Sequence, residues 1–368
     1  MSAQRNAEIL VYVGTWTNEK DAKGEGIHLF RLDPSSGALE FVSKTAEAAN
    51  PFFLAIDSRQ RHLYATNVIE TFEGAPGGSV AAFAIDPKTG ALRHLNQQHA
   101  RGALPCHLSI GPADKHLLVG NYGSGSVSVL PIGEDGRLGP ATDTAQHQGA
   151  SVDKERQEGP HVHSITLDPA GRYAFAADLG IDRVMIYAFD ATQGKLKPGG
   201  QPFVQVKAGA GPRHFAFHPN RRYAYVINEL DNTFTAFRYE EGQGTLTEIQ
   251  TIPTLPGDFK ETSFCADVQV YPSGRFLYGS NRGHDSIAIF AIDEATGRLS
   301  LIGHEPTQGS YPWNLAIDPT HTFLLATNQR SDRVTVFRID PQTGRLTSTG
   351  HVAEVPRPVC AKMIRRAS

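Results

Sequence analysis

Short runs in which apolar and polar residues alternate recur along the whole chain, and this alternation predicts β-strands. The clearest runs come in pairs joined by a turn that carries Pro, Gly, Asp or Asn, residues that preset or tolerate the backbone geometry of a turn. The first pair reads PFFLAIDSRQRHLYATN, and the six pairs begin at Pro51, Pro105, Pro160, Pro212, Ala266 and Pro312. Each pair therefore predicts a hairpin of two strands.

The hairpins return at a nearly constant spacing. Their turns, at positions 58, 112, 169, 219, 272 and 319, are separated by 54, 57, 50, 53 and 47 residues. A third alternating strand is expected after each hairpin, for example over residues 79–85, 126–132, 183–189, 286–292 and 333–339. A fourth strand follows a turn of the type D-P-x-S/T-G, with copies at Asp33, Asp86 and Asp340 and a variant at Asp293. Four antiparallel strands in each repeat of roughly fifty residues are typical of a β-propeller blade.

Six full repeats leave an incomplete unit at each end of the chain. Residues 9–49 carry strands two to four of a blade, and residues 359–364 carry one further strand. Joining the two makes a seventh blade and removes the strand edge that an open array would expose. The sequence therefore predicts an all-β fold, a seven-bladed β-propeller with four antiparallel strands per blade. It predicts one domain over residues 1–368, closed where the C-terminal strand joins the N-terminal blade.

Composition excludes several classes of protein. Of the 368 residues 40% are hydrophobic and 20% are charged, which is enough for a large core, and no apolar run reaches the length of a membrane span. Residues 1–8 are polar and lack the apolar stretch of a secretion signal, so we expect a cytoplasmic protein. The net charge of -3 provides no general attraction for nucleic acid. Neither composition nor pattern predicts an oligomeric state.

Other local features predict turns and isolated side chains. Cys106, Cys265 and Cys360 are too scattered for a disulfide framework or a zinc site, and we expect free, buried thiols. The glycine-rich pieces 74–78 and 120–125 lack the Lys-Ser/Thr ending of a phosphate-binding loop and are expected to be turns. The longest interruption is the polar segment 146–159, which fits either a solvated loop or a flap over the site.

The repeats allow one blade to be compared with another. A residue that every blade shares has a structural role, whereas a residue confined to one blade needs another reason. The second strands end on a shared Asn, for which we expect a turn-forming role, at Asn67, Asn121, Asn228, Asn281 and Asn328, with Asp178 in the remaining blade.

Two positions depart from the shared pattern. One position of the first strand carries His163 and Arg213, where the other blades have Phe52, Cys106, Ala266 and Trp313. The position after the shared Asn carries Glu229 and Arg282, where the other blades have Val68, Tyr122, Leu179 and Gln329. The start of the first strand and the end of the second lie at the same edge of an antiparallel pair. Since first strands surround the central channel, these four charge-capable side chains are expected at one mouth of it.

Five further residues are expected to line the same site. They are His107, His214, Asp267 and Asn314, one position further along the first strands, and His161. Structural explanations stand beside this interpretation, since Arg213 and Glu229 fit a buried ion pair within one blade and His163 fits a core histidine. His161 and His163 are two apart, which places them on one face of a strand and also fits a metal site.

Two arginines, a histidine and a carboxylate around one cavity suit a small anionic substrate, because guanidinium binds carboxylate or phosphate through two parallel hydrogen bonds. Hydrolysis of a lactone needs a base that deprotonates water and a donor for the developing oxyanion. Glu229 or His163 can serve as the base and Arg213 as the donor. This chemistry requires neither a metal nor a cofactor.

Three segments carry a resemblance to a known family. They are GAGPRHFAFHPNRRYAYVINEL over 209–230, ADVQVYPSGRFLYGSNR over 266–282 and YVGTWT over 12–17. Over about residues 9–364 the chain resembles the seven-bladed propeller lactonases, which include bacterial 6-phosphogluconolactonases and fungal carboxy-muconate cyclases. The resemblance implies that His163, Arg213 and Glu229 are catalytic and that Arg282 binds substrate.

The resemblance also implies an activity. The first expectation is a metal-independent hydrolase that opens 6-phosphogluconolactone to 6-phosphogluconate without a cofactor. The alternatives are the lactonizing cyclisation of a carboxy-muconate, in which Glu229 transfers a proton to carbon, and a propeller that only binds other molecules. The 146–159 segment is longer than in compact sugar lactonases of the family, and it runs directly into the strand of His163.

Overall fold

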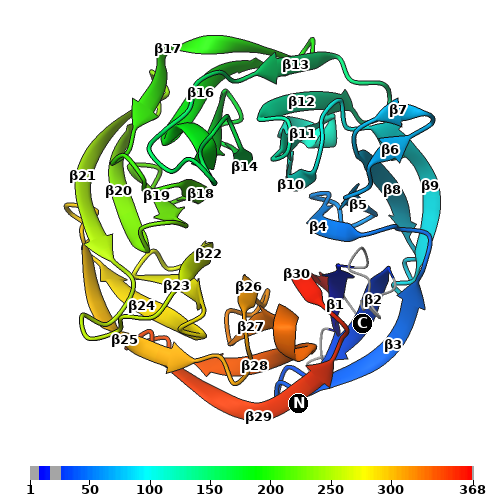
Figure 1. Ribbon diagram of the computed structural model, residues 1–368. Coiled ribbons are helices and arrows are strands. Elements are labelled where there is room, and N and C mark those ends of the chain that lie inside the picture. Colours follow the sequence, from blue (N-terminus) through cyan, green and yellow to red (C-terminus); the bar gives the residue numbers. More distant parts are fainter. Residues whose placement is uncertain (1–7, 17–25, 367–368) are drawn as a thin grey trace.

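The computed structural model describes residues 8–16 and 26–366, and within them seven four-stranded antiparallel sheets surround a central axis (Figure 1). The seven-bladed propeller that the repeats predict is confirmed. From the innermost strand outward, the first blade consists of β30 (Pro358–Arg366), β1 (Glu8–Thr15), β2 (Ile27–Leu32) and β3 (Leu39–Thr45), and the second of β4 (Pro51–Ile56), β5 (His62–Asn67), β8 (Ser79–Ile85) and β9 (Leu92–His99). The third blade consists of β10 (Pro105–Ile110), β11 (His116–Asn121), β12 (Ser126–Pro131) and β13 (Asp143–Gln146). The fourth consists of β14 (Val162–Leu167), β15 (Tyr173–Asp178), β16 (Arg183–Asp190) and β17 (Lys195–Gln205).

In the same order, the fifth blade consists of β18 (Pro212–Phe217), β19 (Tyr223–Asn228), β20 (Thr233–Glu240) and β21 (Thr245–Pro253). The sixth consists of β22 (Phe264–Val270), β23 (Phe276–Arg282), β24 (Ser286–Ile292) and β25 (Leu299–Pro306). The seventh consists of β26 (Pro312–Ile317), β27 (Phe323–Asn328), β28 (Arg333–Ile339) and β29 (Leu346–Glu354). Short elements that the pattern does not predict are β6 (Thr71–Phe72), β7 (Ala75–Pro76) and the 3-10 helices η1 (Pro112–Asp114), η2 (Leu179–Ile181) and η3 (Gln329–Ser331). No helix of the described residues is long and apolar enough to cross a membrane.

The ring closes as the incomplete end units predict. Strand β1 pairs with β30 in antiparallel register from Ile9↔Arg365 to Gly14↔Cys360, and β30 is the innermost strand of that blade. Between blades, the apolar faces of neighbouring sheets pack together, as in the buried cluster that contains Phe175, Phe215 and Phe237. The D-P-x-S/T-G turns form as expected. The Asp86 carboxylate accepts the backbone N–H groups of Lys88 and Thr89, and Gly90 supplies a φ of 78°.

The role expected for the shared Asn is wrong in its details. The side chains do not bond within a turn but reach across to hydroxyl groups of the third strand, as from Asn228 to Thr233 at 2.8 Å and to Thr235 at 3.0 Å. Asn121 makes the same kind of contact with Ser126 and Ser128. All five of these asparagines are fully buried, so each one ties the second strand to the third from inside the sheet.

A β-bulge interrupts the pairing of every innermost strand near its start. In five blades one residue of the innermost strand is skipped between consecutive pairs of the register, and the skipped residues are Cys106, His163, Arg213, Trp313 and Val359. A bulge re-aims the extra side chain and leaves it outside the ladder. The two unusual first-strand residues that the repeat comparison singles out, His163 and Arg213, therefore sit on such bulges.

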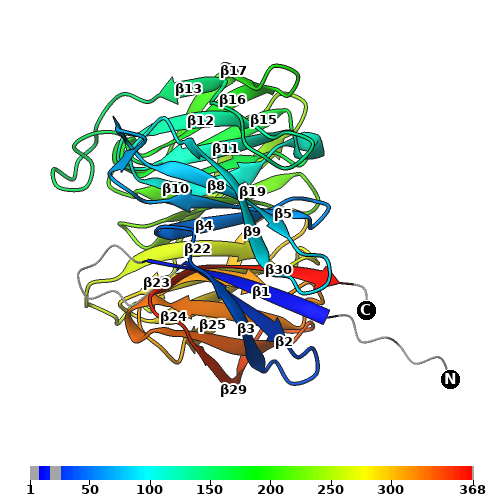
Figure 2. The ribbon, with the colours of Figure 1, turned by 90° about the vertical axis from the view of Figure 1, so that its right-hand side faces the viewer.

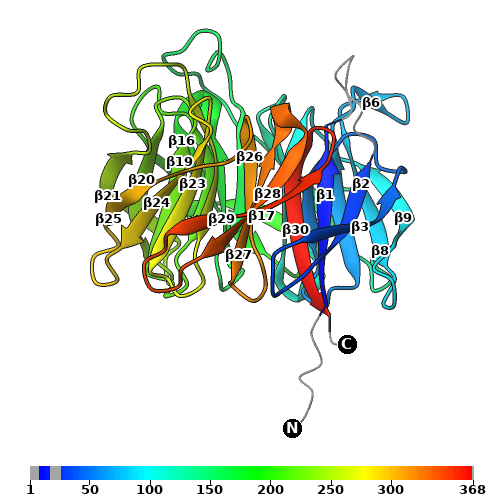
Figure 3. The ribbon, with the colours of Figure 1, turned by 90° about the horizontal axis from the view of Figure 1, so that it is seen from below.

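The two faces of the ring differ. The segment between β13 and β14 projects beyond the ring on the face opposite the described ends of the chain, as Figures 2 and 3 both show. The innermost strands begin at the face with this projection, since β30 begins there and ends beside the C-terminus. The bulges near the strand starts therefore belong to the face that the projecting segment overhangs.

Candidate active site

The carboxylate of Glu229 is surrounded by the three other residues that the repeat comparison selects. Its Oε2 atom lies 2.9 Å from Nε of Arg213, 2.8 Å from Nη2 of Arg282 and 3.7 Å from Nε2 of His163. All four side chains are at least nine-tenths buried. The structure thus brings together at one mouth four residues that come from three consecutive blades.

A fifth residue of this group was missed by the sequence comparison. Nη2 of Arg156 donates a hydrogen bond to the other carboxylate oxygen of Glu229, Oε1, at 2.6 Å. Arg156 belongs to the 146–159 segment, so the structure favours the flap over the solvated loop. The repeat could not reveal it, because a segment without a counterpart in other blades offers no equivalent position. We call Glu229, His163, Arg213, Arg282 and Arg156 the Glu229 cluster.

Strand geometry explains the positions. His163 and Arg213 occupy the bulges of β14 and β18. Glu229 directly follows β19, and its backbone N–H donates to the carbonyl of Gly211 at 2.7 Å, which fixes the edge of the hairpin. Arg282 is the last residue of β23. First-strand starts and second-strand ends meet here as antiparallel pairing requires.

Arg213 is fully buried and almost completely engaged. Its Nε donates to Glu229, and its Nη1 donates to the carbonyl oxygen of Ala266 and, at 3.3 Å, to Nε2 of His214. Its Nη2 has no hydrogen-bond partner among the described residues. A buried guanidinium donor without an acceptor is costly, so Nη2 is suited to donate a hydrogen bond to an oxygen of a substrate.

Aromatic rings form the other side of the mouth. The Arg282 guanidinium lies 4.7 Å from the ring centroid of Trp313, and its Nη2 donates to the carbonyl of Cys265 at 2.9 Å. The rings of Trp16, Phe52 and Trp313 contact one another edge to face, with centroids 5.1 to 5.7 Å apart. A mouth with cations on one side and apolar rings on the other suits an anionic molecule with a carbon ring.

Four residues expected to line the site form a second layer beside the Glu229 cluster. His214 lies 2.7 Å from Asp267, and Asn314 donates to the second oxygen of that carboxylate at 2.5 Å. His107 packs against His214 with ring centroids 5.2 Å apart. Of these four, His214 touches the cluster directly, through Arg213. The layer therefore supports the arginine.

The expectation that His161 and His163 share one face of a strand is wrong. Strand β14 begins at Val162 and is bulged at His163, so His161 lies before the strand. Its ring stacks on Tyr122 with centroids 4.5 Å apart, and its Nε2 lies 3.0 Å from Glu158. Across residues 8–16 and 26–366, no three His, Cys, Asp or Glu side chains come close enough together to hold a metal ion.

Burial and charge set the protonation of the cluster. Burial raises the pKa of Glu229, but Arg282, Arg213 and Arg156 outweigh it and lower that pKa to about 2. Burial, followed by the charge of Arg213, lowers the pKa of His163 well below its ordinary value. At neutral pH the carboxylate is therefore ionised and His163 is neutral. Three arginines and one carboxylate leave two surplus positive charges.

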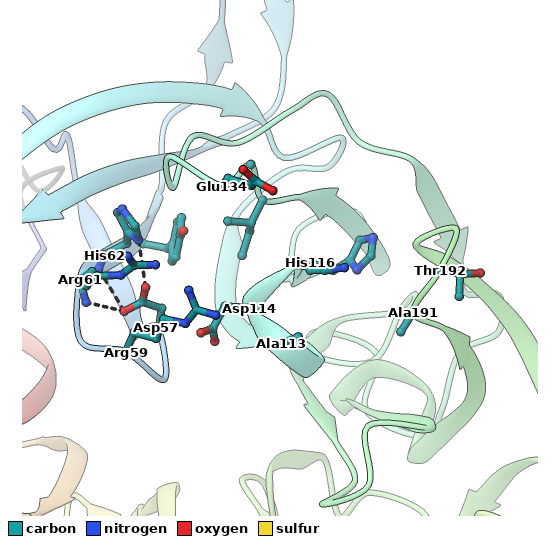
Figure 4. Close-up of a pocket in the computed structure, with 14 residues that line it drawn as sticks. Asp57, Arg59, Arg61, His62, Ala113, Asp114, His116, Glu134, Ala191 and Thr192 are labelled. Atoms are coloured by element: carbon teal, nitrogen blue, oxygen red, sulfur yellow. Dashed lines mark hydrogen bonds and ion pairs between the residues drawn. The ribbon is translucent and has the colours of Figure 1, made fainter.

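A large groove lies at the other end of the innermost strands, around the turns that follow β4 and β10 (Figure 4). It has a volume of about 820 Å³. Its cationic side chains are Arg59, Arg61 and Lys115, and they are matched by three carboxylates, Asp57, Asp114 and Glu134. Since these charges cancel, the groove lacks the cationic surplus of the Glu229 cluster.

The chain is similar in sequence to known proteins. The family model described as "Lactonase, 7-bladed beta-propeller" matches residues 10–363. A 6-phosphogluconolactonase of Bacillus subtilis is 39% identical over 355 residues, which cover 96% of this chain and 98% of the relative. A 6-phosphogluconolactonase of Formosa agariphila is 36% identical over 84% of this chain and 86% of the relative.

Solved structures are similar to this chain over nearly its whole length. The periplasmic gluconolactonase of Pseudomonas aeruginosa superposes with a TM-score of 0.89 at 32% identity, covering 97% of this chain and 99% of that one. A crystal structure from Bacteroides fragilis reaches a TM-score of 0.90 at 34% identity, covering 99% of this chain and all of the other. The chain belongs to the seven-bladed β-propeller lactonase family.

Proposed function

We propose that this protein is a 6-phosphogluconolactonase, which hydrolyses 6-phosphogluconolactone to 6-phosphogluconate. The observation that carries the proposal is the surplus of two positive charges in the Glu229 cluster, where three arginines surround one carboxylate. A phosphate monoester carries about -1.5 to -2 charges at pH 7 and accepts several hydrogen bonds, so it matches this surplus. The two curated relatives named above carry the same activity in their names.

We assign the proton transfer to His163. A carboxylate with a pKa of about 2 is a weak base. Burial and Arg213 lower the pKa of His163 as well, but its neutral imidazole has an unprotonated ring nitrogen that can accept a proton from water. The Glu229 carboxylate, 3.7 Å from Nε2, stabilises the imidazolium that forms. The negative charge of a bound phosphate adds to this stabilisation and raises the pKa of the imidazole.

The reaction then needs no further reagent. The oxygen of water attacks the lactone carbonyl carbon while His163 takes one proton, and Nη2 of Arg213 stabilises the oxyanion. When the tetrahedral intermediate collapses, the bond from carbon to the ring oxygen breaks and the imidazolium returns the proton to that oxygen. The products are a carboxylate, a free hydroxyl group and one released proton.

The predictions about substrate class, cofactor and cellular location are more general. The substrate is a small lactone and no cofactor enters the proposed steps. The cytoplasmic location stays a prediction, since the similar gluconolactonase of Pseudomonas aeruginosa is periplasmic.

A substrate comparison tests the proposal. We would measure turnover of 6-phosphogluconolactone, gluconolactone and carboxy-muconate, each corrected for the reaction without enzyme, and repeat it with His163→Ala and Arg213→Ala. The proposal expects enzymatic hydrolysis of the phosphorylated lactone that both substitutions abolish. Turnover of carboxy-muconate alone would establish the cyclase instead, and turnover of none of the three would favour a binding scaffold.

A further inference from the structure

Arg156 differs from the other arginines of the Glu229 cluster in its exposure. Its side chain is 34% exposed, whereas that of Arg282 is 4% exposed and that of Arg213 is fully buried. It also approaches Glu229 from the opposite carboxylate oxygen. An anion arriving from solvent therefore meets Arg156 first.

The 146–159 segment is anchored rather than loosely draped. Asp182, fully buried, accepts hydrogen bonds from the Ser151 hydroxyl and from the side-chain amide of Gln157. The same carboxylate accepts the backbone N–H groups of Gly209 and Gly211, in the loop that leads into Arg213. One carboxylate thus ties the segment that bears Arg156 to the loop that precedes the catalytic strand.

The base of the segment has a second anchor. Asp178 stands where five other blades have Asn, and its two oxygens lie 2.6 Å from Nδ1 of His147 and 2.7 Å from the backbone N–H of His161. The departure from the shared Asn is explained by these contacts, which hold the segment at both ends. Arg156 is therefore held at the site by an anchored segment.

The net charge of the Glu229 cluster indicates a role for Arg156. Without it the cluster contains two arginines and one carboxylate, a surplus of one positive charge, which is too small for a phosphate monoester. Arg282 is committed to Glu229 and Cys265, and Arg213 to Glu229, Ala266 and His214. The remaining Nη2 of Arg213 is assigned above to the oxyanion. Arg156 has one carboxylate oxygen as its ion-pair partner among the described residues, and it also contacts the Tyr122 side chain and the Phe264 ring, neither of which carries a charge.

We propose that Arg156 is a specificity-determining residue, which binds the phosphate group and makes the enzyme prefer the phosphorylated lactone to the unphosphorylated one. This inference rests on the proposed function. If Arg156 served only to hold Glu229 in place, its loss would harm both substrates equally. If it binds phosphate, its loss harms the phosphorylated substrate far more.

The test compares two substrates in three variants. For wild type, Arg156→Gln and Arg156→Lys we would measure kcat/KM with 6-phosphogluconolactone and with gluconolactone. Since a charge-assisted contact accounts for about a tenfold or greater difference in affinity, we expect Arg156→Gln to lower the ratio of the two values at least about tenfold, mainly through KM. Arg156→Lys keeps the charge and is expected to restore part of the ratio. An unchanged ratio would overturn the proposal.

The matched control is Lys154→Gln, which removes an exposed cation two positions away on the same segment and is expected to keep the wild-type ratio. A calorimetric titration with 6-phosphogluconate provides a readout that does not depend on turnover. Weaker binding to Arg156→Gln than to wild type supports the phosphate role, and equal binding contradicts it. Because wild type without hydrolytic activity would refute only the proposed function, the two failures are distinguishable.

Discussion

Nδ1 of His214 lies 2.7 Å from Oδ1 of Asp267, and both side chains are buried on innermost strands of neighbouring blades. The opposite ring nitrogen is 3.3 Å from Nη1 of Arg213. Because a guanidinium can only donate, Nε2 accepts and the proton of the neutral imidazole resides on Nδ1, directed at Asp267. A continuous chain of contacts therefore runs from Asp267 through His214 to the Glu229 cluster.

Replacing this carboxylate should loosen Arg213. Asp267→Asn removes a charged acceptor that also receives the Asn314 amide and the backbone N–H of Leu315. We expect unfolding free energy to fall by about 2 kcal/mol, with a lower kcat, because buried hydrogen bonds to charged groups contribute about 1.5–3 kcal/mol each. Urea denaturation and steady-state kinetics measure both. Asp258→Asn, at an exposed position, is the control, and equal stability of the two variants would contradict the role of Asp267.

Removing the charge of Glu229 should damage catalysis. Glu229→Gln leaves three arginines without their shared carboxylate and leaves the imidazolium of His163 without its counter-ion. We expect kcat to fall by about a hundredfold or more, because general acid–base catalysis typically contributes at least this factor to the rate. The control is Glu155→Gln on the exposed part of the 146–159 segment. A kcat within twofold of wild type would remove Glu229 from the mechanism.

Acid should destabilise the protein through its buried histidines. Burial, followed by the charge of Arg213, lowers the pKa of His214 from 6.5 to about 4. Between these values the unfolded chain binds the proton and the folded chain does not, so stability is highest above pH 6.5 and falls as the pH drops toward 4. The loss from His214 is about 3 kcal/mol in total. Urea denaturation at several pH values measures it, and His214→Gln should show a shallower decline than wild type.

The anchor of the 146–159 segment makes a prediction about proteolysis. Asp182→Ala deprives Ser151, Gln157, Gly209 and Gly211 of one shared acceptor. We expect trypsin to cut the variant after Lys154 or Arg156 much faster than wild type, because cleavage requires the segment to open locally. Peptide mapping by mass spectrometry locates the cuts. Identical cleavage rates at these bonds would show that the segment does not depend on Asp182.

Local pattern was sufficient for the ring and for much of the cluster. The repeat fixes which residues are equivalent in each blade, so His163, Arg213, Glu229 and Arg282 stand out against Cys106, Trp313 and their other counterparts. The structure shows why this works, since first-strand bulges and second-strand ends coincide at the mouth. That these residues act on substrate, and that residues 1–368 form one domain, remain predictions.

What the sequence could not predict depends on contacts between distant segments. Arg156 reaches Glu229 across 73 positions, and no periodicity relates the two. The bulge that separates His161 from His163 is a matter of hydrogen-bond register, which alternation alone does not reveal. The cross-strand role of Asn228 likewise needs the third strand in place, because its partners Thr233 and Thr235 lie beyond the turn.

The pairing of β1 with β30 has a consequence for folding during protein synthesis. Ile9 leaves the ribosome early but meets its partner Arg365 only when almost the whole chain has been made. The three blades that bear His163, Arg213, Glu229 and Arg282 are complete within residues 162–306, so they can assemble during synthesis with their own local hairpins. The blade that contains β1 and β30 is therefore the last to form. Until it forms, the ring is open and the β-sheets at its two ends are not covered by a neighbouring blade.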